Sequence, residues 1–84
     1  MDTGGLMYVM YRVAYAPGPQ DPPDRDRTLR DFTAVTGREA EKAAREWAAS
    51  RNQMRPRELR EQWPWVLERW NGPTRDWEQV NAIP

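Results

Sequence analysis

The sequence contains no cysteine and no histidine among its 84 residues. The absence of cysteine excludes disulfides, thiolate nucleophiles and zinc sites of the cysteine type. The absence of histidine removes the commonest general base and the commonest nitrogen ligand for metals. A covalent mechanism would have to use Ser50, a threonine, Lys42 or a carboxylate, and the pattern places no base near Ser50. We therefore predict a protein that is not an enzyme and that binds no cofactor or metal.

The sequence also lacks a net charge and a glycine-rich loop. Thirteen basic residues balance thirteen acidic residues, so no overall field attracts the chain to nucleic acid or to an anionic membrane. The five glycines are scattered, which excludes a phosphate-binding loop. The apolar stretch 6–16 is too short to span a bilayer and contains Arg12, and no basic segment precedes it as in a signal peptide. We expect a cytoplasmic protein without membrane contact.

The length allows one hydrophobic core, so residues 1–84 are expected to form a single small domain, with a flexible segment at 1–5. Residues 6–16 are rich in aromatic and β-branched side chains and predict a strand. The better core face of this strand carries Met7, Val9, Tyr11, Val13 and Tyr15. Arg12 points to the other face, which indicates either partial solvent exposure or a carboxylate partner.

Residues 17–27 contain four prolines and several polar residues, a composition that predicts a loop. The loop is longer than a tight hairpin needs, so it is either functional or mobile. Residues 28–35 predict a second strand, antiparallel to the first. The aspartates in and after the loop raise the question of a metal site, but Arg25 and Arg27 interleave with them and favour a solvated loop instead. These aspartates are Asp21, Asp24, Asp26 and Asp31.

The segment from Thr36 to Glu39 has the pattern of a capping box, which predicts the start of a helix. The helix is expected to end near Asn52. Glu41 is placed to pair with Arg45 one turn later. The predicted apolar face of the helix consists of Ala40, Ala43, Ala44 and Trp47.

A second helix is predicted from Pro56, which suits a first turn. Its apolar stripe comprises Leu59, Trp63, Val66, Leu67 and Trp70. Pro64 lies inside the stripe and predicts a kink or two short helices, and residues 71–73 predict the end of the helix. The tail, residues 74–84, favours an edge strand, with a short helix as the alternative. The expected fold is α+β, with a two- or three-stranded antiparallel sheet packed against two helices in the order β-β-α-α-β.

Trp65 lies off the stripe of the predicted second helix. It is therefore either packed by the tail or exposed as an anchor for a partner, because tryptophan and arginine are enriched at binding hot spots. We predict partner contacts on this helix at five residues: Arg55, Arg57, Arg60, Trp65 and Arg69. Its arginines and tryptophans also have the elements of a nucleic-acid surface, although intrahelical ion pairs account for most of the charge.

The stretch Gln53-Met-Arg-Pro-Arg-Glu-Leu59 follows a helix that contains Trp47. It resembles the Asp-Met-Arg-Pro stretch near the end of MbtH-like proteins, which are small accessory partners of nonribosomal peptide synthetase adenylation domains. The Ser-Leu-Trp-Pro signature and the Gly-Trp pair of that family are absent from this sequence. The resemblance therefore transfers no activity.

The leading hypothesis is a non-enzymatic protein-binding module that inhibits or adapts a larger protein assembly. Small proteins of phages and other mobile elements that block host defence, such as anti-CRISPR proteins, have this size and this lack of catalytic residues, which is an analogy of class only. The alternative is nucleic-acid binding through Arg51, Arg55, Arg57 and Arg60 with the neighbouring tryptophans. A homodimer is compatible with either hypothesis.

Overall fold

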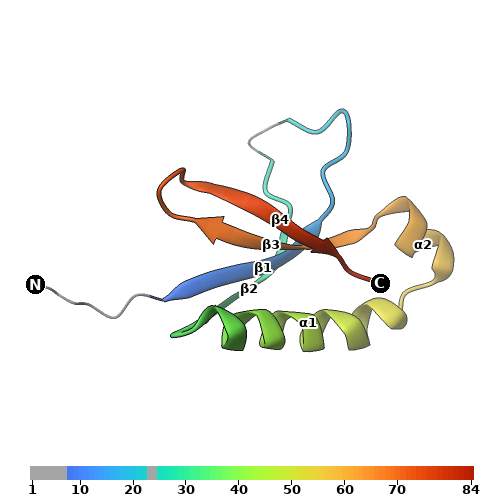
Figure 1. The fold of residues 1–84 in the computed structure, drawn as a ribbon. Coiled ribbons are helices and arrows are strands. Elements are labelled where there is room, and N and C mark those ends of the chain that lie inside the picture. Colours follow the sequence, from blue (N-terminus) through green and yellow to red (C-terminus); the bar gives the residue numbers. More distant parts are fainter. Residues whose placement is uncertain (1–7, 23–24) are drawn as a thin grey trace, which may run out of the picture.

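One four-stranded antiparallel sheet with a long helix across one face forms the body of the molecule (Figure 1). The computed structural model describes residues 8–22 and 25–84. Strands and helices follow the chain in the order β-β-α-α-β-β and are β1 (Val9–Tyr15), β2 (Thr28–Ala34), α1 (Gly37–Gln53), α2 (Arg57–Gln62), β3 (Trp65–Asn71) and β4 (Asp76–Ala82). The α+β class is confirmed. The prediction of two or three strands was wrong, as was the order, because the sheet has four strands in the spatial order β2-β1-β3-β4.

The first two strands form the antiparallel pair that the sequence predicts, with Val9 opposite Ala34 and Tyr11 opposite Phe32. Tyr11 and Val13 are buried, as expected for the core face of β1. Of the connection between the two strands, residues 16–22 and 25–27 are described, and they lie on the side of the sheet away from α1 (Figure 1). The predicted flexible segment 1–5 lies outside the described residues.

Helix α1 begins at the predicted cap, where the backbone N–H of Glu39 donates to Thr36 Oγ1 at 3.2 Å. The expected pair between Arg45 and Glu41 is also present, at 2.7 Å. The buried face differs from the prediction, because Ala43 is exposed and Trp47 is partly buried. Residues four apart lie on one side of a helix, and the side that meets the sheet consists of Ala40, Ala44, Ala48 and Asn52.

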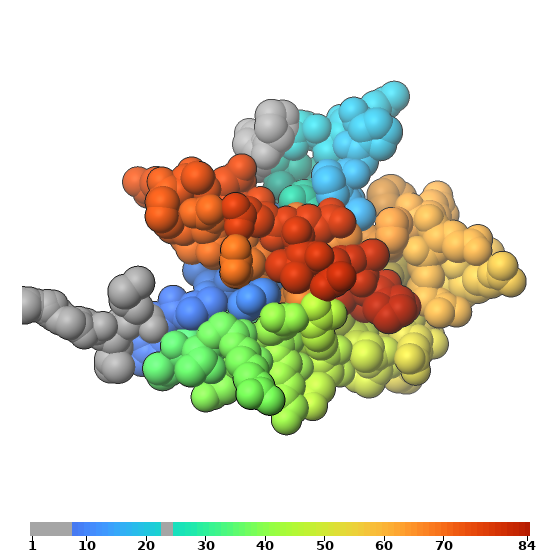
Figure 2. All heavy atoms as spheres, viewed as in Figure 1, coloured from blue at the N-terminus to red at the C-terminus, as the bar shows by residue number. Residues whose placement is uncertain are grey.

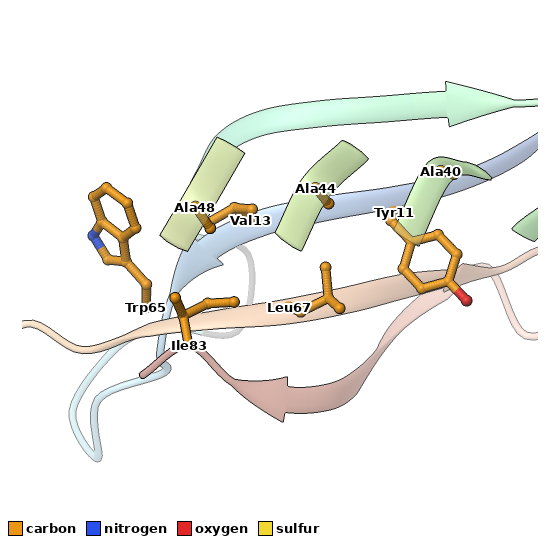
Figure 3. Close-up of a cluster of buried hydrophobic side chains, with 8 residues drawn as sticks. All are labelled: Tyr11, Val13, Ala40, Ala44, Ala48, Trp65, Leu67 and Ile83. Carbon is orange, nitrogen blue, oxygen red and sulfur yellow. The ribbon is translucent and has the colours of Figure 1, made fainter. Parts of the chain in front are cut away.

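The alanines allow α1 to lie close to the sheet, mainly to β1 and β2, because their side chains add little thickness between the layers. Figure 3 shows the three alanines in a row above Tyr11, Val13 and Leu67. Leu67 and Val13 are the largest side chains that are fully buried. Leu29 and Phe32 of β2 pack against this core from the side.

The predicted second helix was wrong beyond Gln62. Trp63 has the non-helical angles φ −129° and ψ 69°, because the ring of Pro64 disfavours a helical conformation in the residue before it. The chain then enters β3, which pairs with β1 so that Trp65 lies opposite Tyr15. Trp65 and Leu67 thus share the face that meets α1, and the proline ends the helix instead of kinking it.

The tail forms β4, so the preferred strand is confirmed. Residues 72–75, predicted as the region after a helix end, form the turn of the β3–β4 hairpin. Asn71 Oδ1 accepts from the Thr74 backbone, and Arg75 adopts a left-handed φ of 56°. Asparagine, glycine and proline are common in both helix ends and turns, which explains the error.

The sheet face away from α1 contains a buried ion-pair network. Arg12 and Glu68 are only 7% and 4% exposed, and Arg12 Nη2 lies 2.7 Å from Glu68 Oε1. Arg27 Nη2 lies 3.1 Å from Glu68 Oε2. The ring of Trp77 covers the Arg12 guanidinium, with 4.3 Å from Cζ to the ring centroid. The carboxylate partner that Arg12 requires is thus Glu68 of β3.

The end of the chain lies against the C-terminal turn of α1 (Figures 1 and 2). Buried Asn52 donates from Nδ2 to the carbonyl of Pro84 at 2.8 Å. Ile83 is buried in the core. In the part of the chain that the structure describes, neither helix has the length and the apolar character needed to cross a membrane.

Candidate interaction surface

Helix α2 carries its apolar residues on the outside of the molecule. It has six residues and none of them is buried. Trp63, which caps its C-terminus, is 50% exposed, and Leu59 is 43% exposed. This exposure follows from the local sequence, because Pro56 and Pro64 confine the helix to fewer than two turns. The short helix therefore presents Leu59 and Trp63 to solvent.

Tyr15, at the end of β1, joins these two residues. Tyr15 is 39% exposed, and together with Leu59 and Trp63 it lines a hollow of about 340 Å³. Arg25 and Arg55 line the same hollow. We call Tyr15, Leu59 and Trp63 the aromatic patch.

A second hollow of about 500 Å³ adjoins the aromatic patch, because Tyr15 and Trp63 line both. Its other wall is the connection between β1 and β2, including Pro17 and Pro19. Its charged lining consists of three carboxylates and two arginines: Asp21, Asp26, Glu61, Arg25 and Arg27. The patch thus lies between a hollow bordered by arginines and a hollow that contains charged groups of both signs.

Two of these carboxylates are held by backbone hydrogen bonds. The Gly18 N–H donates to Asp21 at 2.8 Å, and the Thr28 N–H donates to Asp26 at 2.9 Å. These bonds favour the charged form and lower the pKa of both carboxyl groups, and Arg25 lowers the pKa of Asp21 further. No group of three acidic side chains in the described ranges is placed to hold a metal ion, and Asp24 lies outside those ranges.

Arg55, the first of the predicted contact residues, holds α1 and α2 together. Its Nη1 donates to Asn52 Oδ1 at 2.7 Å, and its Nη2 donates to the carbonyls of Leu59 and Trp63 at 2.9 and 2.6 Å. Its guanidinium lies 4.6 Å from the ring centroid of Trp65. Arg55 therefore positions Trp63, and most of its donors are already used.

Trp65 is packed inside the molecule, which settles the two alternatives for this residue. It is 8% exposed and stacks on Trp47 with 5.9 Å between ring centroids. The indole ring is thus enclosed by Trp47 and Arg55. Exposed Trp63, two residues earlier, has the surface position that the sequence suggested for Trp65.

The other predicted contact residues do not form one surface. Arg57 is exposed and pairs with Glu61 at 3.1 Å. Arg60 is partly buried, and its Nε is buried without a hydrogen-bond partner among the described residues. Arg69, on β3, pairs with Glu78 at 3.1 Å, and this hydrogen bond raises the pKa of Arg69. The structure brings only Arg55 together with the aromatic patch.

A second cluster was not predicted as a unit. The Cζ atom of Arg51 lies 4.7 Å from the ring centroid of Trp47, and that of Arg30 lies 5.8 Å from the same centroid. We call Arg30, Trp47 and Arg51 the arginine–tryptophan cluster. The spacing of Trp47 and Arg51 by one helical turn could have indicated their contact. The contribution of Arg30 depends on how β2 lies beside α1, which no local pattern reveals.

Comparisons of the chain with protein-family models, with curated proteins and with solved structures found no match.

Proposed function

We propose that this protein is a non-enzymatic protein-binding module that inhibits or adapts a larger protein, and that the aromatic patch is its main contact. The observation that carries the proposal is the placement of Tyr15, Leu59 and Trp63 around one hollow while each is more than a third exposed. A small protein loses hydrophobic stabilisation by leaving such groups in water. Clustered apolar groups of this kind on a surface are typical of interaction sites.

Trp63 is well suited to be the anchor of this contact. Its backbone is fixed by Pro64 and by the hydrogen bond from Arg55 to its carbonyl. A side chain that is already positioned loses less conformational entropy when it binds. The two hollows beside Trp63 offer space for side chains of a partner.

The test is affinity capture from the cells that naturally contain the protein, followed by binding measurements with the purified captured protein. Wild type and the control variant Val35→Ala should capture the same protein, because Val35 is exposed but lies outside both hollows. Trp63→Ala should lose it while its circular dichroism shows that the variant is folded. Equal capture by Trp63→Ala would overturn the proposal.

Nucleic-acid binding through Arg51, Arg55, Arg57 and Arg60 has less support from the geometry. Arg55 is committed to carbonyl oxygens and Arg57 to Glu61. Few of these charges remain to neutralise phosphates, and the number of such contacts sets the affinity. Salt-dependent binding to oligonucleotides at low ionic strength would favour this alternative.

A further inference from the structure

The arginine–tryptophan cluster contains two guanidinium groups that lack an acidic partner. Over the described ranges, neither Arg30 nor Arg51 lies within ion-pair distance of a carboxylate. Among the described residues, the Arg51 side chain makes one hydrogen bond, a long one of 3.5 Å to the carbonyl of Trp47. Contact with the ring orients a guanidinium and leaves its N–H groups free to donate. The guanidinium groups of both arginines can therefore donate hydrogen bonds to carboxylates of another molecule.

The two arginines share one aromatic ring. Each contacts the ring of Trp47, so their Cζ atoms cannot be further apart than the sum of the two ring distances, 4.7 and 5.8 Å. Trp47 is in turn fixed by Trp65 and by Phe32, whose ring lies 5.8 Å away in an edge contact. The two guanidinium groups thus lie against a ring that is itself held by packing on two other aromatic rings.

The cluster is continuous with the aromatic patch. Trp47 stacks on Trp65, Trp65 is covered by Arg55, and Arg55 lines the hollow of Trp63. The link runs through buried Trp65, and Arg25 and Arg55 add two arginines beside the patch itself.

We infer that the arginine–tryptophan cluster binds acidic side chains of a protein partner, next to an apolar side chain that packs on the aromatic patch. This inference rests on the proposed function and adds the chemistry of the partner: a segment that combines aspartate or glutamate with large apolar residues. Guanidinium and carboxylate groups form paired, charge-assisted hydrogen bonds. The two arginines therefore select for acidic side chains of the partner, and the aromatic patch buries an apolar side chain next to them.

The surroundings favour an acidic protein segment over a nucleic acid. One face of Trp47 is covered by Trp65 and Arg51 also lies against the ring, so Trp47 is not open for base stacking. The neighbouring hollow is lined by Asp21, Asp26 and Glu61 as well as by Arg25 and Arg27, so it offers no continuous positive track for a phosphate backbone. A short acidic segment can place its charges at the arginines alone.

The test uses three probes: a short peptide of glutamate and leucine, the same peptide with glutamine in place of glutamate, and a short oligothymidine. Nuclear magnetic resonance of the five tryptophan indole N–H groups reports where each probe binds. The glutamate peptide should shift the signals of Trp47 and Trp63 and leave those of Trp70 and Trp77 unchanged. The double variant Arg30→Gln/Arg51→Gln should bind this peptide about tenfold more weakly.

Arg75→Gln, which removes an exposed arginine from the β3–β4 turn, is the matched control and should bind like wild type. Equal binding of the two peptides, or shifts that the double variant does not weaken, would overturn the inference. Arginine-dependent binding of oligothymidine alone would replace it with a nucleic-acid site. If the captured protein depends on Trp63 but not on Arg30 and Arg51, the proposed function stands and this inference fails.

Discussion

The molecule uses arginine on tryptophan in two regions, and the two differ in whether a carboxylate completes the contact. On the open face of the sheet, Arg12 lies over Trp77 and is neutralised by buried Glu68. At the C-terminal end of α1, Arg51 lies over Trp47 with no carboxylate in ion-pair distance in the described part of the chain. The distance from the arginine Cζ to the tryptophan ring centroid is similar in both regions, 4.3 Å for Arg12 and 4.7 Å for Arg51. In the first region the charge is paired within the fold, whereas in the second it is the charge that we propose for binding a partner.

Burial explains this difference. A charge removed from water needs a partner and hydrogen bonds, or the cost of desolvation is not offset. Arg12 satisfies this requirement through Glu68 and Thr28 Oγ1. Arg30 and Arg51 are exposed, so water solvates them until a partner replaces it.

The largest expected effect concerns the aromatic base under the exposed arginines. Trp65→Ala removes a nearly buried indole that stacks on Trp47, and we expect a loss of about 3–5 kcal/mol in the free energy of unfolding. Trp63→Ala should cost less than half as much, because half of that side chain is already in water. Urea unfolding followed by far-ultraviolet circular dichroism measures both. Equal losses would show that the assignment of the two tryptophans is wrong.

The next effect tests the neutralised region. Glu68→Gln leaves Arg12 and Arg27 without their carboxylate, and we expect a loss on the order of 3 kcal/mol. The control is Glu78→Gln, which breaks the exposed pair with Arg69 and should change stability far less, because water and salt screen an exposed pair. Urea midpoints of the two variants give the comparison. A loss for Glu68→Gln as small as that for Glu78→Gln would contradict the structural role of the network.

The smallest effect tests the exposed region. Arg51→Gln removes one contact with the face of Trp47, and an exposed contact of this kind contributes about 0.5–1 kcal/mol. The free energy of unfolding should therefore fall only slightly. The difference between wild type and variant should be the same at low and high salt, because the substitution removes no ion pair that salt would screen. The same urea measurement at two salt concentrations decides the matter. A loss as large as that for Glu68→Gln would show that Arg51 is part of the fold and not held for a partner.

The sequence predicts the first half of the fold well. The two N-terminal strands, the loop with its prolines and the cap at Thr36 depend on neighbouring residues, and local chemistry specifies them. The second half fails where the residues from Trp65 to Trp70 are apolar on both sides of the chain. A strand covered on both faces and a helix cannot be distinguished by the period of their apolar residues alone. Glu68 adds to the difficulty, because nothing in the local sequence indicates that this charged residue is buried opposite Arg12.

The candidate surface could be predicted only in part. The sequence directs attention to the segment after Arg55 and to an exposed tryptophan, but it selects Trp65 because that residue lies off a helical stripe that does not exist. Tyr15 and Arg30 lie on strands that are far in sequence from the helical segments they meet. The contact of Tyr15 with the hollow of Trp63, and of Arg30 with Trp47, therefore depends on how the sheet and α1 pack together. Long-range packing of this kind has no local signal.

Hydrogen exchange of the protein, alone and bound to the captured partner, tests most directly whether the end of the molecule around α2 is the contact surface. We predict that the partner slows exchange of the backbone amides in residues 57–63 and at the C-terminal turn of α1. Exchange in the β3–β4 turn, residues 72–75, should stay as it is in the free protein. Slowed exchange in that turn together with unchanged exchange in residues 57–63 would contradict the account.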